Sequence, residues 1–181
     1  MRLVRHHESD SGHLEGSLSD ISARRAAELE LDYIAHHDSL TGLANRVLFK
    51  DRLANAPSYA ERYHQHLATR FIDLDRFKVI NDTLGHTVGD RLLTHVAERL
   101  SESVRQSDSV GRHADHEPTH ALARLGGDEL TVLLTALPTP EDAGRVARRI
   151  LEALAHPLSI DGHEIFISAS IGISIFPSDG A

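Results

Sequence analysis

Cysteine and tryptophan are absent from this 181-residue chain, and aromatic residues make up only 4% of it. Without cysteine the chain can hold no disulfide, thiolate zinc site or iron–sulfur cluster, and it has no Cys nucleophile. Few aromatic side chains are available for stacking single-stranded nucleic acid. No apolar run approaches the ~18 residues of a membrane span, and residues 1–10 lack the apolar core of a signal peptide. We therefore expect a cytoplasmic chain with no membrane segment and no nucleic-acid partner, although its parent protein could be membrane-attached upstream.

Basic residues are also in the minority, since 19 Lys and Arg stand against 27 Asp and Glu for a net charge of −8. This balance disfavours binding to a phosphate backbone, which depends on Lys and Arg. The net negative charge still allows a small anionic ligand such as a nucleotide, if metal ions offset the repulsion between the ligand and the acidic side chains. The apolar fraction of 40% and the charged fraction of 25% are typical of one folded domain and exclude a wholly disordered chain.

Helix and strand patterns alternate along the sequence. Apolar spacing predicts helices over residues 22–37, 46–57, 90–104 and 139–155, with Pro57 ending or kinking the second. Strands are predicted over residues 66–73, 121–125 and 130–135, and a further hairpin over 158–160 and 164–175 around Asp161-Gly162. Residues 77–90 indicate a polar turn, and 111–120 an exposed loop. This interleaving favours an α/β or α+β sheet with helices on its faces.

The predicted helix over residues 22–37 has an apolar stripe formed by Ala23, Ala27, Leu31 and Ile34. The stripe suits a surface helix that packs on its own domain. It equally suits a linker helix that dimerises, although two heptads only suggest a coiled coil. Both interpretations stay open at this point.

Two acidic clusters stand where predicted strands stop. Asp73 and Asp75 close one strand and share a face of it, because strand side chains alternate. Asp128 and Glu129 occupy the tip of a predicted hairpin. If the strands are neighbours, these carboxylates meet at one sheet edge and offer the oxygen ligands that Mg²⁺ prefers. Paired ions there could neutralise a triphosphate, activate a hydroxyl and stabilise a leaving pyrophosphate. The alternative is that the acids only keep the turns soluble.

Glycines and an amide lie near these acids. Gly126 and Gly127 would let the backbone approach a ligand closely, although hairpins use glycine pairs routinely. Asn81 and Asp90 belong to a second polar cluster and could hydrogen-bond a base edge. The alternative is that Asp90 caps the following helix and that Gly85 builds a turn.

Four stretches of the sequence occur in the order and approximate spacing found in GGDEF domains. They are DSLTGLANR at 38–46, FIDLDRFKVINDTLGHTVGD at 71–90, ARLGGDEL at 123–130 and SIGISIFP at 170–177. The chain resembles this family over residues 38–181. The resemblance implies a nucleotide-cyclase fold related to polymerase palms, with a central, mostly antiparallel sheet flanked by helices. It also implies a diguanylate cyclase, which condenses two GTP into cyclic di-GMP, releases two pyrophosphates and uses Mg²⁺ or Mn²⁺.

The resemblance implies catalytic and metal-binding roles for individual residues. Asp73 and Asp128 would bind metal, together with the backbone carbonyl of Leu74. Asp128 would also accept the proton of the 3′-hydroxyl, and Glu129 would assist it. Lys78 would stabilise the charge that develops on the phosphates.

Substrate contacts follow from the same resemblance. Asn81 and Asp90 would hydrogen-bond guanine, which would explain a choice of GTP over ATP. The backbone at Gly126 and Gly127 would lie against the nucleotide, and Phe77 would complete the substrate-binding set. Arg105 and Asp108 match an RxxD motif and form a candidate product-inhibition site.

The family's chemistry implies a homodimer, because each half-site supplies one GTP and the two hydroxyls attack reciprocally. The linker helix over residues 22–37 and the GGDEF domain over 38–181 would form it. Residues 12–21, GHLEGSLSDI, resemble the end of a PAS sensor domain, so residues 1–21 are expected to be its remnant.

The sequence also departs from the family's pattern. Leu130 stands where the signature has Phe, and 17 residues lie between Asp108 and Gly126. His113, His116 and His120 in this insertion could bind a metal or simply belong to a solvated loop. The chain stops at Ala181, short of the family's final helix and strand, so we expect a truncated domain of uncertain activity. The alternative function is a catalytically inactive GGDEF module that binds GTP or cyclic di-GMP for regulation.

Overall fold

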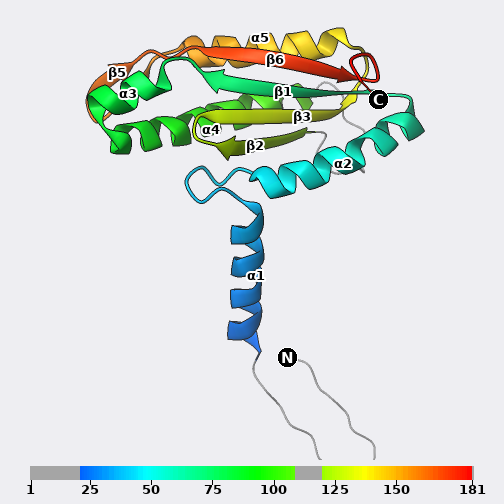
Figure 1. The fold of residues 1–181 in the computed structure, drawn as a ribbon, viewed down its shortest axis with the longest axis horizontal. Helices are drawn as coiled ribbons and strands as arrows, with labels where there is room; N and C mark the ends of the chain where they lie inside the picture. Colours follow the sequence, from blue (N-terminus) through cyan, green and yellow to red (C-terminus); the bar gives the residue numbers. More distant parts are fainter. Residues whose placement is uncertain (1–20, 109–119, 181) are drawn as a thin grey trace, which may run out of the picture. The chain divides into compact units, whose positions relative to one another are not determined.

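The computed structural model describes residues 21–108 and 120–180. Figure 1 shows its helices and strands, coloured along the chain. The helices are α1 (Ser22–His36), α2 (Arg46–Tyr63), α3 (Phe77–Leu84), α4 (His86–Asp108) and α5 (Glu141–Ala155). The strands are β1 (His66–Leu74), β2 (His120–Gly126), β3 (Glu129–Leu137), β4 (Leu158–Ile160), β5 (His163–Ile165) and β6 (Ala169–Phe176). Contacts divide the chain into two units, residues 1–35 and 36–181.

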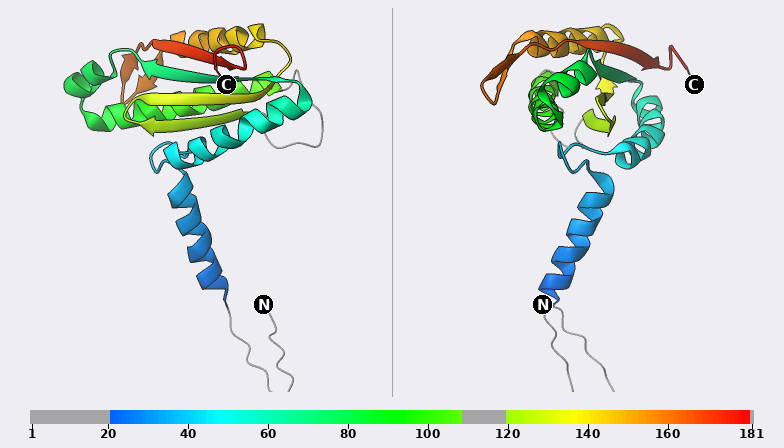
Figure 2. Two further views of the ribbon diagram at one scale, coloured as in Figure 1. Left: turned by 45° about the vertical axis from the view of Figure 1, so that its right-hand side comes forward. Right: turned by 60° about the vertical axis from the view of Figure 1, so that its left-hand side comes forward.

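The second unit is built around a four-stranded sheet in the order β2-β3-β1-β6. Every pairing in it is antiparallel, with β1 in contact with both β3 and β6. Figure 2 shows helices on both faces of this sheet. The expected fold, a central antiparallel sheet flanked by helices, is confirmed.

Alternation along β1 gives the sheet two different faces. Ala68, Ile72 and Leu74 point to the face covered by α4 and α5, where the larger apolar core lies. Leu67 points to the opposite face and joins a smaller core with α2, which contributes Phe49 among others. The open end of this second face leaves Phe71 half exposed beside Asp73.

Helix α1 has no buried residue. Leu31 and Ile34, two members of its predicted apolar stripe, are 68% and 58% exposed. The predicted span of residues 22–37 matches the bounds of α1 to within one residue. Among the described residues, no helix is both long and apolar enough to cross a lipid bilayer.

The prediction of a polar turn over residues 77–90 is wrong. Helix α3 occupies residues 77–84, and α4 begins at His86 rather than near Asp90. Phe77, Ile80 and Leu84 recur at helical spacing and pack on the larger core, which offsets the polar character of the rest. Asp90 accordingly lies inside α4 and does not cap it. Gly85, with φ of 88°, makes the sharp connection.

Of the two outcomes predicted for Pro57, an end or a kink, the end is excluded, because Pro57 lies inside α2 with the buried Ala56 and Ala60 on either side of it. One further prediction needs correction. The predicted hairpin at the C-terminal end forms only between β4 and β5. Residues beyond Ile165 leave it, and β6 joins the central sheet beside β1. The predicted PAS remnant falls almost wholly on residues 1–20, outside the described residues.

Candidate active site

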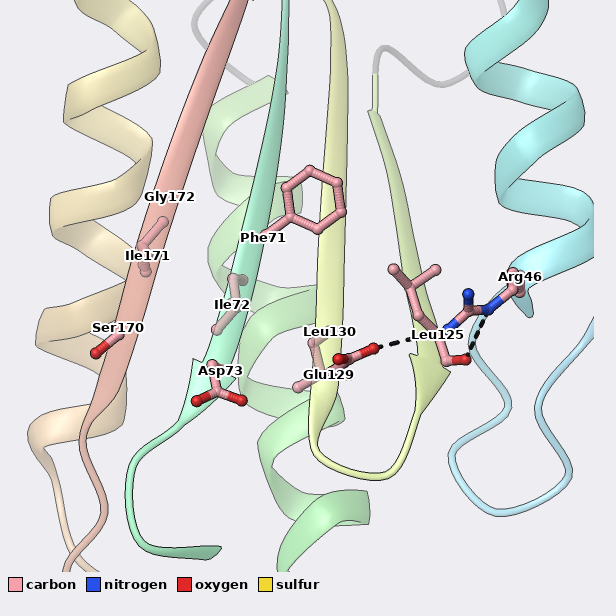
Figure 3. Close-up of a pocket in the computed structure, with 10 residues that line it drawn as sticks. All are labelled: Arg46, Phe71, Ile72, Asp73, Leu125, Glu129, Leu130, Ser170, Ile171 and Gly172. Carbon is pink, nitrogen blue, oxygen red and sulfur yellow. Dashed lines mark hydrogen bonds and ion pairs between the residues drawn. The ribbon is translucent and has the colours of Figure 1, made fainter.

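Asp73 and Glu129 are direct cross-strand partners at one end of the sheet. The register pairs Asp73 of β1 with Glu129 of β3 on one side and with Ser170 of β6 on the other. Opposite residues of an antiparallel pair project to the same face, so the two carboxylates share it. Figure 3 shows both at the rim of a groove beside the sheet edge. The predicted meeting of the two acidic clusters thus occurs between neighbouring strands.

Negative charge gathers at this end of the sheet, where four acidic side chains influence one another. Desolvation raises the pKa of Asp73, and the charges of Asp128, Asp75 and Glu129 raise it further. Neighbouring like charges favour protonation of one carboxylate or the binding of a compensating cation. A divalent ion suits the oxygen-only donor set, since Mg²⁺ takes few protein carboxylates and completes its shell with water and phosphate. Within residues 21–108 and 120–180, no group of three or more His, Cys, Asp or Glu is arranged to hold a metal by itself.

Asp75, paired with Asp73 in the sequence analysis, has a different environment. Its carboxylate accepts hydrogen bonds from Ser168 Oγ at 2.6 Å and Ser170 Oγ at 2.9 Å. These two bonds lower the pKa of Asp75 and hold it ionised. Asp75 therefore connects the end of β1 to the start of β6 and holds in place the end of the strand that carries Asp73.

The turn between β2 and β3 needs its glycines. Gly126 and Gly127 have φ of 143° and 56°, which disfavour any side chain. A Cβ at either position would meet nothing within 4 Å, so open space surrounds both. Asp128 follows them half-buried, and Glu129 is exposed. The turn therefore presents accessible backbone beside the two acids.

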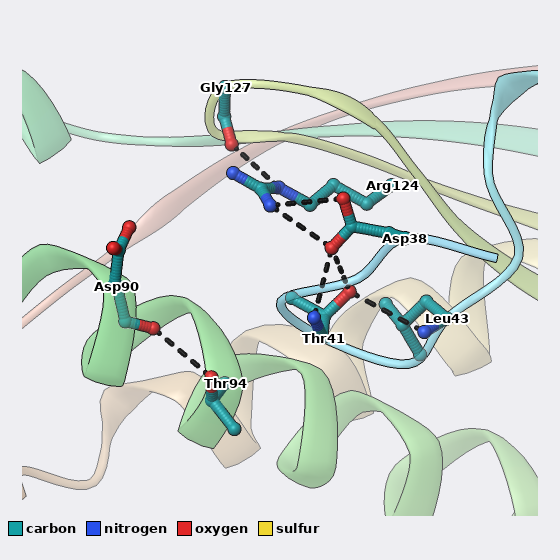
Figure 4. Close-up of polar contacts among 7 residues, drawn as sticks. All are labelled: Asp38, Thr41, Leu43, Asp90, Thr94, Arg124 and Gly127. Atoms are coloured by element: carbon teal, nitrogen blue, oxygen red, sulfur yellow. Dashed lines mark hydrogen bonds and ion pairs between the residues drawn. The ribbon is translucent and has the colours of Figure 1, made fainter. Parts of the chain in front are cut away.

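Arg124 connects this turn to the residues that follow α1. Its Nε donates to the carbonyl of Gly127 at 2.9 Å, and its Nη1 donates to both carboxylate oxygens of Asp38 at 3.0 and 3.2 Å (Figure 4). Thr41 donates its N–H and hydroxyl to the same Asp38 at 2.9 and 2.7 Å. Burial alone raises the pKa of Asp38, but the bonds from Thr41 and Arg124 outweigh it and lower that pKa. The stretch at 38–46 resembles the family, yet no role was predicted for Asp38 or Arg124.

Arg46 approaches the other side of the turn. Its Nε donates to the carbonyl of Leu125 at 3.2 Å, and its Nη2 lies 3.7 Å from Glu129 Oε2. Both side chains of this ion pair are more than half exposed. The groove that they border has a volume of about 640 Å³, and its lining includes Asp73 and Phe71. Arg46 is the cation among its lining residues, a role that the sequence analysis did not assign.

Helices α3 and α4 carry the other predicted site residues. Lys78 and Asp90 are exposed, and Asn81 is half-buried where the two helices meet. Asn81 Oδ1 is buried, with no hydrogen-bond partner among the described residues. Phe77 is only 7% exposed and belongs to the larger core, so its side chain is turned away from solvent.

Some predicted residues are placed by their backbone only or lie outside the described part of the chain. Leu74 is 1% exposed, which leaves its carbonyl as the group with a predicted metal role. Arg105 and Asp108 lie in the last turns of α4, but their side chains are outside the described residues. The same holds for the side chain of His120 and for all of His113 and His116. Leu130, the departure from the family signature, is 1% exposed and fills the core as an apolar residue should.

Comparison with known proteins identifies the class. The family model described as "Diguanylate cyclase, GGDEF domain" matches residues 35–181. Diguanylate cyclase TpbB of Pseudomonas aeruginosa is 43% identical over 148 residues, which are 81% of this chain and 31% of TpbB. The bifunctional diguanylate cyclase/cyclic di-GMP phosphodiesterase MucR of the same species is 44% identical over 154 residues, 85% of this chain and 21% of MucR.

Solved structures agree with the sequence matches. The GGDEF domain of TpbB (YfiN) from P. aeruginosa superposes with a TM-score of 0.69 at 40% identity, covering 80% of this chain and 79% of that one. A sensory box/GGDEF family protein from Caulobacter crescentus gives 0.69 at 41% identity, covering 80% and 86%. The GGDEF domain of DgcB from C. crescentus, solved in complex with c-di-GMP, gives 0.66 at 26% identity, covering 78% and 77%.

The chain belongs to the GGDEF-domain family of diguanylate cyclases. It spans between a fifth and a third of the curated relatives MucR and TpbB.

Proposed function

We propose that residues 38–181 form the catalytic domain of a diguanylate cyclase, which condenses two GTP into cyclic di-GMP and releases two pyrophosphates. The observation that carries the proposal is the register of β1 and β3, which sets Asp73 opposite Glu129 with Asp128 in the adjoining turn. Three carboxylates at one exposed edge suit the transfer of a nucleotidyl group to a hydroxyl.

The acids divide into two roles. Asp73, with the Leu74 carbonyl, would hold Mg²⁺ or Mn²⁺ together with Asp128. The bound ion would offset triphosphate charge and favour the ionised 3′-hydroxyl. Asp128 would accept the proton of that hydroxyl, and Glu129, held near Arg46 in the described structure, would assist it. The neighbouring charges of Asp128, Asp75 and Glu129, which help to raise the pKa of Asp73, are charges that a bound cation would offset.

The triphosphate would lie between the glycine turn and the start of α3. The first turn of α3 has no side-chain cap, and the N-terminal end of a helix favours anions, so this end would suit the phosphates. Lys78 is exposed on the same turn and would stabilise charge on the phosphates. The open space around Gly126 and Gly127 leaves room for the nucleotide against the backbone.

The nucleobase would be recognised where α3 meets α4. Guanine offers an acceptor at O6 and donors at N1 and N2, which complement the amide of Asn81 and the carboxylate of Asp90. Adenine presents a donor where guanine has O6, so it leaves these groups unpaired, and such mismatches give strong discrimination.

Reciprocal attack of two nucleotides requires two copies of the domain. The exposed apolar side chains of α1, including Leu31 and Ile34, would pair with those of a second copy to form the homodimer. Replacing both by Lys should shift the protein to monomers in sedimentation velocity and reduce cyclic di-GMP formation. An unchanged dimer population would contradict this part of the proposal.

The test of the chemistry is a matched pair of variants assayed with GTP and Mg²⁺. Asp128→Asn removes the proton acceptor while keeping size and hydrogen bonding, and it should lower the rate by 10²-fold or more. Glu152→Gln changes an exposed acid on α5, a helix that covers the sheet face opposite to that of Asp73, and should leave the rate unchanged. Turnover by Asp128→Asn at the wild-type rate would overturn the assignment, and nucleotide binding without turnover in the wild type would favour the regulatory alternative.

A further inference from the structure

Gly89 stands inside a helix where glycine is an unfavourable residue. It lies in the first turns of α4 and is buried, and its N–H donates to the carbonyl of Gly85 at 3.2 Å. No positive φ requires a glycine there, because Gly89 is not among the residues with that conformation. Alanine supports a helix better than glycine does. The position therefore needs another reason to lack a side chain.

That reason is the side chain of Asn81. A Cβ built on Gly89 would overlap Asn81 Oδ1 and lie 2.9 Å from Asn81 Cγ and 3.4 Å from Phe77 Cζ. The Asn81 side chain thus lies directly on the α4 backbone, one residue before Asp90. Its Oδ1 is buried there without a hydrogen-bond partner among the described residues. A buried polar atom in this state suits a side chain whose partner arrives with a ligand.

We infer that Gly89 is a specificity-determining positioning residue, whose missing side chain allows Asn81 to lie against α4 beside Asp90 and so to address guanine. The inference rests on the proposed function, since it assumes that Asn81 and Asp90 bind the base. Gly89 touches no substrate and acts only through Asn81.

A methyl group at residue 89 should displace the Asn81 side chain without unfolding the protein. The atoms that a Cβ would meet first belong to the outer part of the Asn81 side chain, which can rotate away without moving the backbone. Gly89→Ala should therefore keep the fold and displace the amide. Gly144→Ala is the matched control, because Gly144 also lies inside a helix, α5, and a Cβ there meets nothing within 4 Å.

The experiment measures the affinities for α,β-methylene analogues of GTP and ATP, which cannot release pyrophosphate, by calorimetry with Mg²⁺. In Gly89→Ala the affinity for the GTP analogue should fall about tenfold or more, as expected for the loss of a buried hydrogen bond to the base, while the ATP analogue changes little. Gly144→Ala should match the wild type for both. Thermal unfolding of Gly89→Ala should remain close to that of the wild type.

A double-mutant cycle with Asn81→Ala completes the test. Asn81→Ala removes the atoms that the new methyl group would meet, so Gly89→Ala should have no further effect on GTP-analogue affinity in that background. This arm also provides a folded protein if the single variant is unstable. An undiminished preference for the GTP analogue in Gly89→Ala would overturn the inference on Gly89, and so would an equal loss of GTP-analogue affinity in both backgrounds. Either result would leave the proposed function standing. A wild type with no preference between the analogues would overturn the guanine site of the proposed function, and this inference with it.

Discussion

The guanidinium of Arg124 donates to both carboxylate oxygens of Asp38, 86 positions earlier in the chain, at 3.0 and 3.2 Å. Because Arg124 also holds the Gly127 carbonyl, the residues that follow α1 are connected to the turn that carries Asp128. The side chains of this pair are only 13% and 22% exposed, which shields the contact from water. Stability and turn geometry should therefore depend on Asp38, although it touches no predicted substrate group.

Asp38→Asn should lower the free energy of unfolding at pH 7 by about 1.5–3 kcal/mol, the usual range for a hydrogen bond to a charged group. The pKa of Asp38 is lowered in the folded state, so its contribution is present above its ordinary value of 3.8 and is lost as the pH falls through the lower folded pKa. Urea unfolding at a series of pH values should show the difference between wild type and variant shrinking below about pH 4. A difference that stays constant in acid would contradict this account.

An exposed pair provides the control for this prediction. Arg24 and Glu28 form an ion pair on α1 with side chains 80% and 61% exposed. Glu28→Gln should change the free energy of unfolding by less than about 0.5 kcal/mol, as surface pairs generally do. An effect as large as that of Asp38→Asn would mean that charge alone, not position, explains both.

Arg70 is a charged residue in the core with few partners. It is 0% exposed on β1, and its guanidinium donates to the Ala143 carbonyl while Nε and Nη1 lack partners among the described residues. Burial lowers the pKa of Arg70 to about 10, a sign that the fold disfavours its charge. Arg70→Leu should raise the free energy of unfolding, by about 1–4 kcal/mol where a buried charge is replaced by a well-packed apolar side chain. A lower thermal midpoint for this variant would show that Arg70 stabilises the fold.

Gly127 and Gly172 differ in conformation although both have open space around them. Gly127 has φ of 56°, whereas Gly172, in β6, has no positive φ. Gly127→Ala should cost about 1–2 kcal/mol of stability, the penalty of a side chain in the left-handed region. Gly172→Ala should be neutral or stabilising, because alanine suits a strand better. Equal chemical-denaturation midpoints for the two variants would refute the claim that the turn is constrained.

Asp73→Asn should separate folding from metal binding. The raised pKa of Asp73 means that its ionised form is disfavoured in the fold, so wild-type stability gains as the pH falls through that pKa. Without metal at neutral pH, the variant should be at least as stable as the wild type. Adding Mg²⁺ with a GTP analogue should raise the thermal midpoint of the wild type and not that of the variant. Equal midpoint shifts in both proteins would place the metal elsewhere.

The end of the sheet that carries the acids was predicted from the sequence better than the helices around it. Asp73 and Glu129 stand at the ends of strongly apolar strands, so their meeting needed only the assumption that those strands are neighbours. Residues 77–90 were misassigned because their polar side chains hide a short apolar face, and an eight-residue helix is stable only against a core that local pattern does not reveal.

The supporting contacts were beyond prediction for a similar reason. Arg124 and Asp38, or Arg46 and Glu129, come together only through the tertiary fold, and no spacing in a single sequence encodes such pairs. The closeness of Gly89 to Asn81 likewise depends on how α3 packs on α4. The family resemblance predicts which residues act, whereas the structure shows which residues hold them in place.

The most direct measurement of the central claim is the stoichiometry of the reaction. The purified chain is incubated with GTP and Mg²⁺, and nucleotides and pyrophosphate are quantified by chromatography with mass detection. Condensation by two facing half-sites predicts two GTP consumed and two pyrophosphates released for each cyclic di-GMP formed. GTP recovered unchanged, or consumed without cyclic di-GMP, would contradict the claim that this chain is a diguanylate cyclase.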